Sequence, residues 1–142
     1  MTRILVMGLP GSGKTTLANK LSDKLQPDCL WLNADIIRKK QNDWDFSLDG
    51  RLRQAIRIRE YADQSKNSFV IADFVCPLPE MRAVYNADIT IWMDTIVASI
   101  FEDTNNLFVP PENYDFRITE QNADKWATHI YNTIINFSYR IN

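Results

Sequence analysis

A glycine-rich segment near the start of the chain combines residue types that can hold an anion. It reads Gly8-Leu9-Pro10-Gly11-Ser12-Gly13-Lys14-Thr15 and matches the spacing G-x-x-x-x-G-K-[ST]. Glycines let successive backbone N–H groups turn toward one point, and a helix that starts there adds the positive end of its dipole. We therefore expect this loop, together with Thr16, to bind the phosphates of ATP. Lys14 would reach the β- and γ-phosphates, and the Thr15 hydroxyl would be a ligand of Mg²⁺.

Two aspartates follow apolar runs that are typical of buried strands. Asp35 comes two residues after the run 29–33, and Asp73 directly follows the run 69–72. In open parallel sheets, ligands bind beyond the carboxyl ends of the strands. We expect Asp35 to be catalytic, either by accepting the proton of an acceptor hydroxyl or by orienting that hydroxyl for in-line attack. Asp73 fits the pattern of an aspartate that holds Mg²⁺ directly or through water. Each carboxylate could instead cap the turn that follows it.

Several arginines lie where they could bind an anionic acceptor. Arg38 follows Asp35 by three residues, so that on a helical turn both side chains project to one side. A guanidinium group binds phosphate or sulfate through two parallel hydrogen bonds. Arg51 and Arg57 lie on a long helix further along the chain and are candidates for the same acceptor site. The alternative for each of these two is a solvated helix face.

The order of the predicted elements favours one fold class. Apolar runs predict strands at 3–7, 29–33, 69–73, 89–93 and 114–118, and the stretches between them predict helices at 15–25, 36–40, 48–62, 80–85, 96–102 and from 123 onward. Strands that alternate with helices indicate a parallel sheet covered on both faces. With the phosphate-binding motif, this predicts an α/β P-loop NTPase fold, a three-layer α/β/α arrangement with about five strands. We expect a single P-loop kinase domain over residues 1–142.

Two helices have a predicted buried face. In the long helix the expected apolar positions are Leu48, Leu52, Ala55, Ile56 and Ala62, with Ile58 at the margin and Ser47 as N-cap. In the last helix they are Trp126, Ile130, Ile134 and Phe137, with Asn122 as N-cap. The stretch 103–115 contains two adjacent prolines and three asparagines, and is expected to be irregular.

Composition narrows the range of partners. The net charge is −2 and the pI is near 5.3, which argues against an extended nucleic-acid surface but leaves room for a local basic pocket. No apolar run approaches the length of about 20 residues that spans a bilayer, and no signal-peptide pattern opens the chain. We therefore expect a cytoplasmic protein without membrane contact, in which the two cysteines stay reduced.

Four segments together resemble the adenylylsulfate kinases. They are GLPGSGKTTLA, WLNADIIR, DFSLDGRLRQAIRI and FVIADFVCPLPEMR, and they keep the order and spacing of that family over about the first two thirds of the chain. The resemblance implies transfer of the γ-phosphate of ATP to the 3′-hydroxyl of adenosine 5′-phosphosulfate. It implies that Asp35 is the catalytic aspartate, that Arg38 and Arg51 bind the substrate, and that Phe46 stacks on the substrate adenine. On the residues alone, Phe46 could equally be a loop aromatic that folds back on the core.

The chain also departs from that family. Asn33-Ala34 replaces the first Asp-Gly of the motif around Asp35, and Gln54 replaces an asparagine. Cys76-Pro77-Leu78-Pro79 replaces a Ser-Pro-Tyr-Arg segment. The lid motif Lys-Gly-Leu-Tyr is missing, and the stretch 101–111 in its place carries two acids and no Lys or Arg. Either Arg82 or another basic residue substitutes for the lid cations, or the substrate differs.

Two other functions are compatible with the same residues. A kinase of polynucleotide or modified-nucleotide hydroxyls would share the phosphate loop, Asp35 with Arg38, and Asp73, and a single flipped nucleotide needs only a pocket. A module that binds ATP as a switch without turnover would need only the phosphate loop. The sequence leaves the oligomeric state open, and an exposed Trp44 could contact either a substrate or a second copy in a homodimer.

Overall fold

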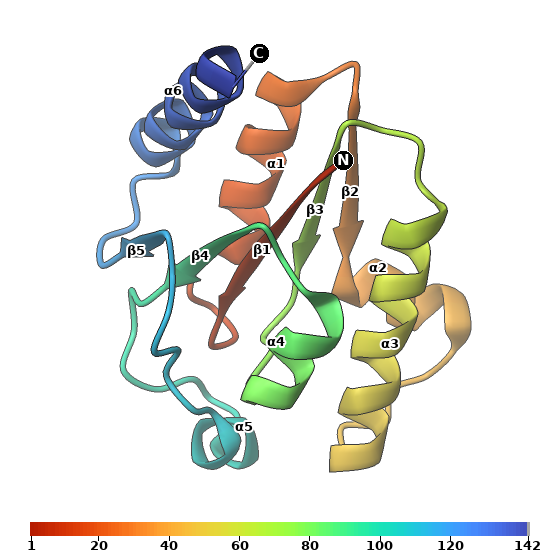
Figure 1. Ribbon diagram of the computed structural model, residues 1–142. Coiled ribbons are helices and arrows are strands. Elements are labelled where there is room, and N and C mark those ends of the chain that lie inside the picture. Colours follow the sequence, from red (N-terminus) through yellow and green to blue (C-terminus); the bar gives the residue numbers. More distant parts are fainter. Residues whose placement is uncertain (142) are drawn as a thin grey trace.

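The computed structural model describes the backbone of residues 1–141 and the side chains of residues 1–136 (Figure 1). The predicted face position Phe137 lies outside the described side chains. Five parallel strands form one sheet in the order β2-β3-β1-β4-β5. They are β1 (Thr2–Gly8), β2 (Cys29–Asn33), β3 (Phe69–Asp73), β4 (Ile89–Met93) and β5 (Phe116–Ile118). The predicted α/β fold with a five-stranded parallel sheet is confirmed.

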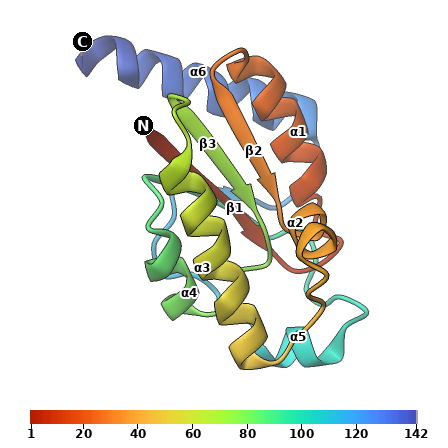
Figure 2. The ribbon, with the colours of Figure 1, turned by 90° about the vertical axis from the view of Figure 1, so that its right-hand side faces the viewer.

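Helices cover both faces of the sheet (Figures 1 and 2). Helices α1 (Lys14–Leu25) and α6 (Ala123–Ile141) pack on one face, and α3 (Leu48–Gln64) and α4 (Pro79–Tyr85) pack on the other. Alternate residues of β1 serve the two cores: Ile4 and Val6 face α1 and α6, whereas Leu5 and Met7 face α3 and α4. Within the described residues, no helix combines the length and the apolar character needed to cross a membrane.

The order of the strands brings the residues predicted to form the site to one edge of the sheet. The chain leaves β1 between β3 and β4, so the glycine-rich loop begins where the strand order reverses. Asn33 and Asp73 are register partners at the ends of β2 and β3. Helix α2 (Ala34–Gln41) starts directly after β2 and carries Asp35 in its first turn. The carboxyl edge of the sheet therefore gathers the phosphate loop and both predicted aspartates.

The region after β4 differs from the prediction. No helix forms at 96–101, and α5 (Glu102–Leu107) lies instead almost entirely in the stretch 103–115 that was expected to be irregular. Side-chain bonds hold the preceding residues in a loop: the Asn105 side chain accepts from the Ser99 backbone N–H and hydroxyl and donates to the Ser99 carbonyl. Val97 and Ile100 are almost fully exposed because this loop extends beyond the sheet and has no core to pack against.

The buried face of α3 agrees with the prediction at Ala55, Ile58 and Ala62, but it differs in the first turns of the helix. Ser47 caps the helix as expected, with its hydroxyl accepting from the Gly50 N–H, but Leu48 and Leu52 are exposed. The buried positions are Gly50, Arg51, Gln54, Ala55, Ile58 and Ala62. The first turns of α3 extend past the strand ends (Figure 2), so their inward positions face the loops of the site rather than the apolar core. Gly50, Arg51 and Gln54 occupy those positions.

Candidate functional site

The phosphate loop has the shape that an anion site requires. Gly13 precedes α1 in the left-handed region, with φ 99°, and no side chain among the described residues caps the helix there. Gly8 allows close packing, because a Cβ at that position would lie 2.5 Å from the Met93 carbonyl oxygen. The exposed N–H groups at the start of this 12-residue helix fit a phosphate chain.

Lys14 supplies the positive charge at this loop. Its Nζ donates to the Leu9 carbonyl oxygen at 3.0 Å, which folds the side chain back over the loop. Burial lowers the pKa of Lys14 to about 8, and the carboxylates of Asp73 and Asp35 act in the opposite direction. The lysine is therefore held between the loop and both predicted aspartates. This is the position from which it can face phosphate oxygens.

A hydrogen-bonded group next to Lys14 fits Mg²⁺. The two oxygens of the buried Asp73 carboxylate have different partners: Oδ2 accepts from Asn33 Nδ2 at 2.8 Å and Trp31 Nε1 at 3.0 Å, while Oδ1 faces the Thr15 hydroxyl at 3.5 Å. Burial raises the pKa of Asp73, and the N–H groups of Asn33 and Trp31 lower it. Oδ1 and the Thr15 hydroxyl are two hard oxygen ligands side by side. Mg²⁺ is usually held by one or two such groups plus water and substrate phosphates.

Asn33 connects this group to α2. Besides Asp73, its Nδ2 donates to the Thr15 hydroxyl at 3.3 Å, and its Oδ1 accepts from the Ile36 N–H at 3.0 Å, which caps α2. One amide thus fixes the predicted metal ligands and the helix that carries Asp35. A carboxylate could not donate these bonds.

A cavity of about 560 Å³ opens beside the phosphate loop. Its walls come from the loop, the ends of β2 and β3, the segment before α3, and the start of α5. The lining residues are Pro10, Gly11, Lys14, Thr15, Asn33, Ala34, Asp35, Trp44, Phe46, Arg51, Asp73, Phe74, Val75, Phe101, Asp103 and Thr104. The cavity therefore joins the predicted phosphate, metal and base residues to an aromatic and cationic wall.

The predicted acceptor residues have different positions. Asp35, Phe46 and Arg51 line the cavity, whereas Arg38 and Arg57 do not belong to its lining. Arg38 is buried behind Phe46: its guanidinium carbon lies 4.3 Å from the ring centroid, and Nη1 donates to the carbonyl oxygens of Asp43 and Asp45. Arg57 donates to Gln54 Oε1 and Asp43 Oδ2. Arg38 and Arg57 thus hold the segment that presents Phe46.

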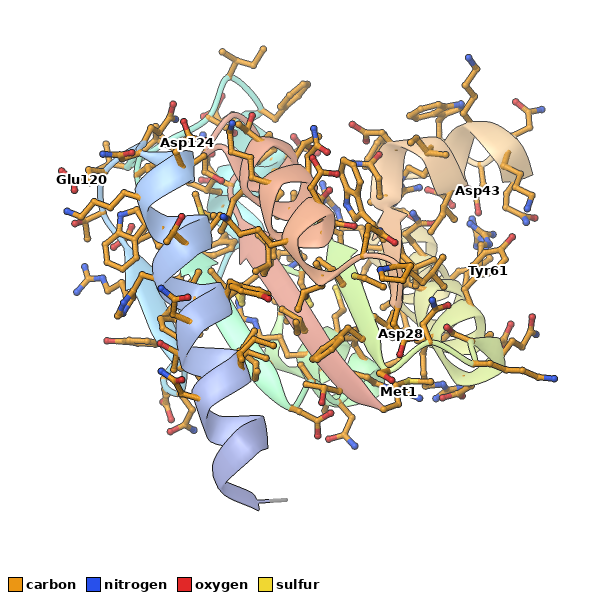
Figure 3. The ribbon with its side chains drawn as sticks, turned by 90° about the horizontal axis from the view of Figure 1, so that it is seen from above. Met1, Asp28, Asp43, Tyr61, Glu120 and Asp124 are labelled. Atoms are coloured by element: carbon orange, nitrogen blue, oxygen red, sulfur yellow. The ribbon has the colours of Figure 1, made fainter. Side chains whose placement is uncertain are left out.

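Asp43 is the centre of that segment, on the α2 side of the molecule and away from Glu120 and Asp124 (Figure 3). Its carboxylate accepts from Arg53 at 2.8 and 3.0 Å and from Arg57 at 2.9 Å. These guanidinium groups, Arg53 first, hold the pKa of Asp43 well below its usual range. The ion pairs fix the loop between α2 and α3, and with it the position of Phe46.

Gly50 gives the first prediction. A Cβ at this position would lie 2.2 Å from the Asp45 backbone oxygen and 2.5 Å from its Cγ, so Gly50→Ala must push the 43–47 segment outward. We expect a loss of about 1–3 kcal/mol in the free energy of unfolding, measured by urea denaturation. Gly11→Ala is the steric control, because its Cβ would meet only Ile96 Cδ1 at 3.9 Å, although its φ of 85° adds backbone strain. Unchanged stability of Gly50→Ala would contradict this packing.

Arg82 does not replace the missing lid cations. Its guanidinium donates to the carbonyl oxygens of Cys76, Pro77 and Val109, and it is absent from the cavity lining. It joins the start of α4 to the segment after α5. Of the basic residues with described side chains, Lys14 and Arg51 line the cavity.

A second cavity lies on the other side of the phosphate loop. It has a volume of about 180 Å³ and is lined by Gly13, Thr16, Leu17, Met93, Ile118, Glu120, Gln121, Asn122, Ala123 and Trp126. Trp126 Nε1 is buried without a hydrogen-bond partner among the described residues. An unpartnered buried N–H beside an apolar cavity favours a ligand that offers an acceptor there.

Sequence reasoning missed several site residues. Trp31 lies two residues before Asn33 and hence on the same face of β2, a signal that alternation could have revealed. Trp44 was considered as a contact to a substrate or to a second copy, but it was not included among the predicted site residues. Phe101, Asp103 and Thr104 gave no signal, because their place in the cavity depends on how the loop after β4 folds back against α3.

Comparison with known proteins agrees with this architecture. The sequence model of the family described as adenylylsulphate kinase matches residues 1–106. Among curated proteins, no sequence matches this chain. An APS kinase of Mycobacterium tuberculosis, solved in complex with AMPPNP and APS, is 20% identical, with 94% of this chain and 96% of that chain covered and a TM-score of 0.77.

Two other kinases have similar folds. A gluconokinase from Sinorhizobium meliloti is 13% identical, with coverage of 99% and 97% and a TM-score of 0.67. A shikimate kinase from Acinetobacter baumannii, in complex with shikimate, is 19% identical, with coverage of 96% and 94% and a TM-score of 0.66. The structural similarity shows the fold of a P-loop kinase. Because the family model matches about three quarters of this chain, the chain belongs to the adenylylsulphate kinase family.

Proposed function

We propose that this chain transfers the γ-phosphoryl group of ATP to a hydroxyl of a small anionic nucleotide bound in the 560 Å³ cavity. The observation that carries the proposal is that Lys14, Thr15 and Asp73 line the same cavity as Asp35, Phe46 and Arg51. Phosphoryl transfer depends on positioning and electrostatic stabilisation. The cavity combines both with room for an acceptor.

The loop 8–16 would hold the triphosphate, with Lys14 against the β- and γ-phosphates and the Thr15 and Asp73 oxygens toward Mg²⁺. When bound, Mg²⁺ neutralises the charge that develops on the phosphate oxygens. The 180 Å³ cavity continues from Gly13 and Thr16, and it is the place where we expect the base of ATP. A base nitrogen could accept from Trp126 Nε1.

Asp35 would orient the acceptor hydroxyl for direct in-line attack and accept its proton, without a covalent enzyme intermediate. Its position in the first turn of α2 supports this role, because Asn33 fixes that turn to the metal ligands. Phe46, Trp44 and Phe101 offer ring faces for a base, and Arg51 offers a cation for the acceptor's anion.

Family membership makes adenosine 5′-phosphosulfate the first acceptor to test, with its 3′-hydroxyl as nucleophile. This proposal includes a single kinase domain, small-molecule partners and a cytoplasmic location, where ATP and Mg²⁺ occur. A hydroxyl of a polynucleotide or modified nucleotide is the second candidate, because the absence of a basic residue from 101–111, where the family has its lid, leaves room for an acceptor other than adenylylsulfate. Neither acceptor proposal depends on whether the protein forms a homodimer.

The test is a screen with radiolabelled ATP and Mg²⁺ across adenylylsulfate, nucleosides, nucleotides and 5′-hydroxyl oligonucleotides. We expect label transfer to one acceptor class, with adenylylsulfate first. Label on an oligonucleotide alone would support the second candidate. ATP binding without transfer to any acceptor would contradict kinase function and indicate a switch.

A further prediction concerns the residues that hold Asp73. Trp31→Phe keeps an aromatic side chain but removes the indole N–H that binds Oδ2, together with part of the ring system. Replacing a partner of a metal-ligating group usually costs 10- to 100-fold in metal affinity. We expect the Mg²⁺ concentration for half-maximal turnover to rise by about tenfold, measured by Mg²⁺ titration at saturating ATP.

The matched control is Trp92→Phe, because Trp92 lies on β4 against Tyr114 and Arg117, outside the cavity. Trp92→Phe should leave the Mg²⁺ requirement unchanged. An equal shift in both variants would show a general effect of losing a tryptophan.

A further inference from the structure

The guanidinium group of Arg51 makes two short hydrogen bonds and one long contact. Nε donates to the Phe46 carbonyl oxygen at 2.8 Å, and Nη2 donates to the Thr104 hydroxyl, also at 2.8 Å. The Asp103 carboxylate is more distant, with Oδ2 3.5 Å from Nη2. Among the described residues, none accepts from Nη1. Since Arg51 lines the cavity, this end of the fork is available to a ligand.

The two side chains of the Arg51–Asp103 ion pair differ in their exposure to solvent. The Arg51 side chain is 8% exposed, whereas that of Asp103 is 71% exposed. Burial lowers the pKa of Arg51, and Asp103 acts in the opposite direction. A buried guanidinium needs a negative charge nearby. An exposed carboxylate loses little when it moves into water, because exposed ion pairs contribute little.

The two partners of Arg51 on α5, Thr104 and Asp103, therefore hold the guanidinium in different ways. Thr104 is buried and makes a short bond that ties α5 to α3 across the cavity. Asp103 compensates the charge of Arg51 loosely from the solvent side. It lies in the cavity lining, where the anionic group of an acceptor would also approach Arg51.

We propose that Asp103 is a displaceable internal anion that sets the affinity of the acceptor site for oxyanions. In the free protein its carboxylate compensates Arg51. A phosphate, sulfate or carboxylate on the acceptor takes its place at the guanidinium, while the bonds to Thr104 and Phe46 persist. An uncharged acceptor does not make this exchange, so Asp103 lowers the affinity of the site for anionic acceptors only, and an anion must bind Arg51 more strongly than Asp103 does to displace it. The inference rests on the proposed function only in taking this cavity as the acceptor site.

The first test uses inorganic sulfate and the full chain, and needs no turnover. The Nε–Hε resonance of Arg51, assigned by its loss in Arg51→Lys, reports sulfate at this site and not at the phosphate loop. We expect Asp103→Asn to tighten sulfate binding by about two- to fivefold, the value of an exposed ion pair. Glu102→Gln is the matched control, because Glu102 is an exposed acid one residue earlier that forms no ion pair with Arg51. It should change binding less than Asp103→Asn.

Weaker or unchanged sulfate binding in Asp103→Asn, or an equal gain in Glu102→Gln, would overturn the proposal. The second test compares adenylylsulfate with adenosine by calorimetry in the presence of AMPPNP and Mg²⁺. Asp103→Asn should tighten adenylylsulfate binding and leave adenosine binding unchanged. Weaker adenylylsulfate binding would make Asp103 a direct acceptor ligand and overturn the exchange. A sulfate effect at Arg51 without label transfer to any acceptor would contradict the proposed function and leave this inference supported.

Discussion

Lys14→Met will lower kcat by at least about 10²-fold, the cost of removing one electrostatic stabiliser of a transition state. Methionine keeps the length of the side chain and removes its charge. Lys14 lies between the phosphate loop and the two aspartates of the cavity, so its charge acts where negative charge develops during transfer. The same change should raise the stability of the protein without ligand.

The gain in stability follows from the pKa of Lys14. Folding lowers that pKa from 10.5 to about 8, so between these values the folded protein binds fewer protons than the unfolded chain. Stability conferred by this residue therefore rises as the pH increases from about 8 to 10.5. Below about pH 8 the full cost of the buried charge is present. Methionine removes that cost, and we expect Tm at pH 7 to rise by at least ~2 °C.

Rapid-quench kinetics and calorimetry test this pair of effects. In the unmodified protein, kcat/KM for ATP should fall above about pH 8 as Lys14 loses its proton, and Lys14→Met should lack this limb. Lys20→Met is the control, since Lys20 pairs with Asp124 on the surface, outside the cavity. Full activity in Lys14→Met would remove Lys14 from the mechanism.

Asp35→Asn will lower kcat by about 10²- to 10⁴-fold, the contribution of a general base, and leave ATP affinity within a few-fold. Asparagine keeps the shape of the side chain and its place in the first turn of α2, but it cannot take a proton from the acceptor hydroxyl. Separate measurement of the ATP dissociation constant and of single-turnover transfer distinguishes binding from chemistry.

Asp49→Asn is the matched control for Asp35. Asp49 also lies in the first turn of a helix, and it is exposed outside the cavity lining. Its change should leave kcat unaffected. If Asp35→Asn weakened only ATP binding, with normal transfer at saturation, Asp35 would belong to the nucleotide site and the acceptor would lie elsewhere.

Sequence patterns predicted the parts of the fold whose signals are local. The run before Gly8, the spacing to Lys14 and Thr15, and the acid that ends the third run specify strands, a loop and their order. Parallel strands end at one edge of a sheet, so the sequence alone predicts that Asp73 and the turn that carries Asp35 lie near the loop. The α/β fold follows from these signals.

The far wall of the cavity could not be predicted, because it depends on contacts between distant segments. Arg51 was expected as a substrate ligand, yet one of its guanidinium bonds joins α3 to Thr104, more than 50 residues away. The first turns of its helix were assigned the wrong buried face, because the apolar Leu48 and Leu52 suggested a core where the helix extends past the sheet. Arg38 and Arg57 are charged residues that support a loop, and the sequence does not distinguish such residues from ligands.

The structure explains two residues at which the sequence departs from the family pattern, Asn33 and Asp103. Asn33 donates from one amide to both Thr15 and Asp73, which a carboxylate at that position cannot do. The acid Asp103 faces Arg51 in the region where the family has a cationic lid. We infer that the acceptor site has fewer free cations than the family pattern implies, so that it binds the anionic group of an acceptor less strongly than a site with the cationic lid would.

The central claim is that the phosphate loop presents the terminal phosphoryl group of ATP to an acceptor hydroxyl beside Asp35. A crystal structure with AMPPNP, Mg²⁺ and the acceptor found by the label screen measures this arrangement directly. We predict the γ-phosphate between Lys14 and the acceptor hydroxyl, Mg²⁺ near Thr15 and Asp73, and the hydroxyl within hydrogen-bond distance of Asp35. A γ-phosphate directed away from Asp35, or an acceptor bound outside the 560 Å³ cavity, would contradict the claim.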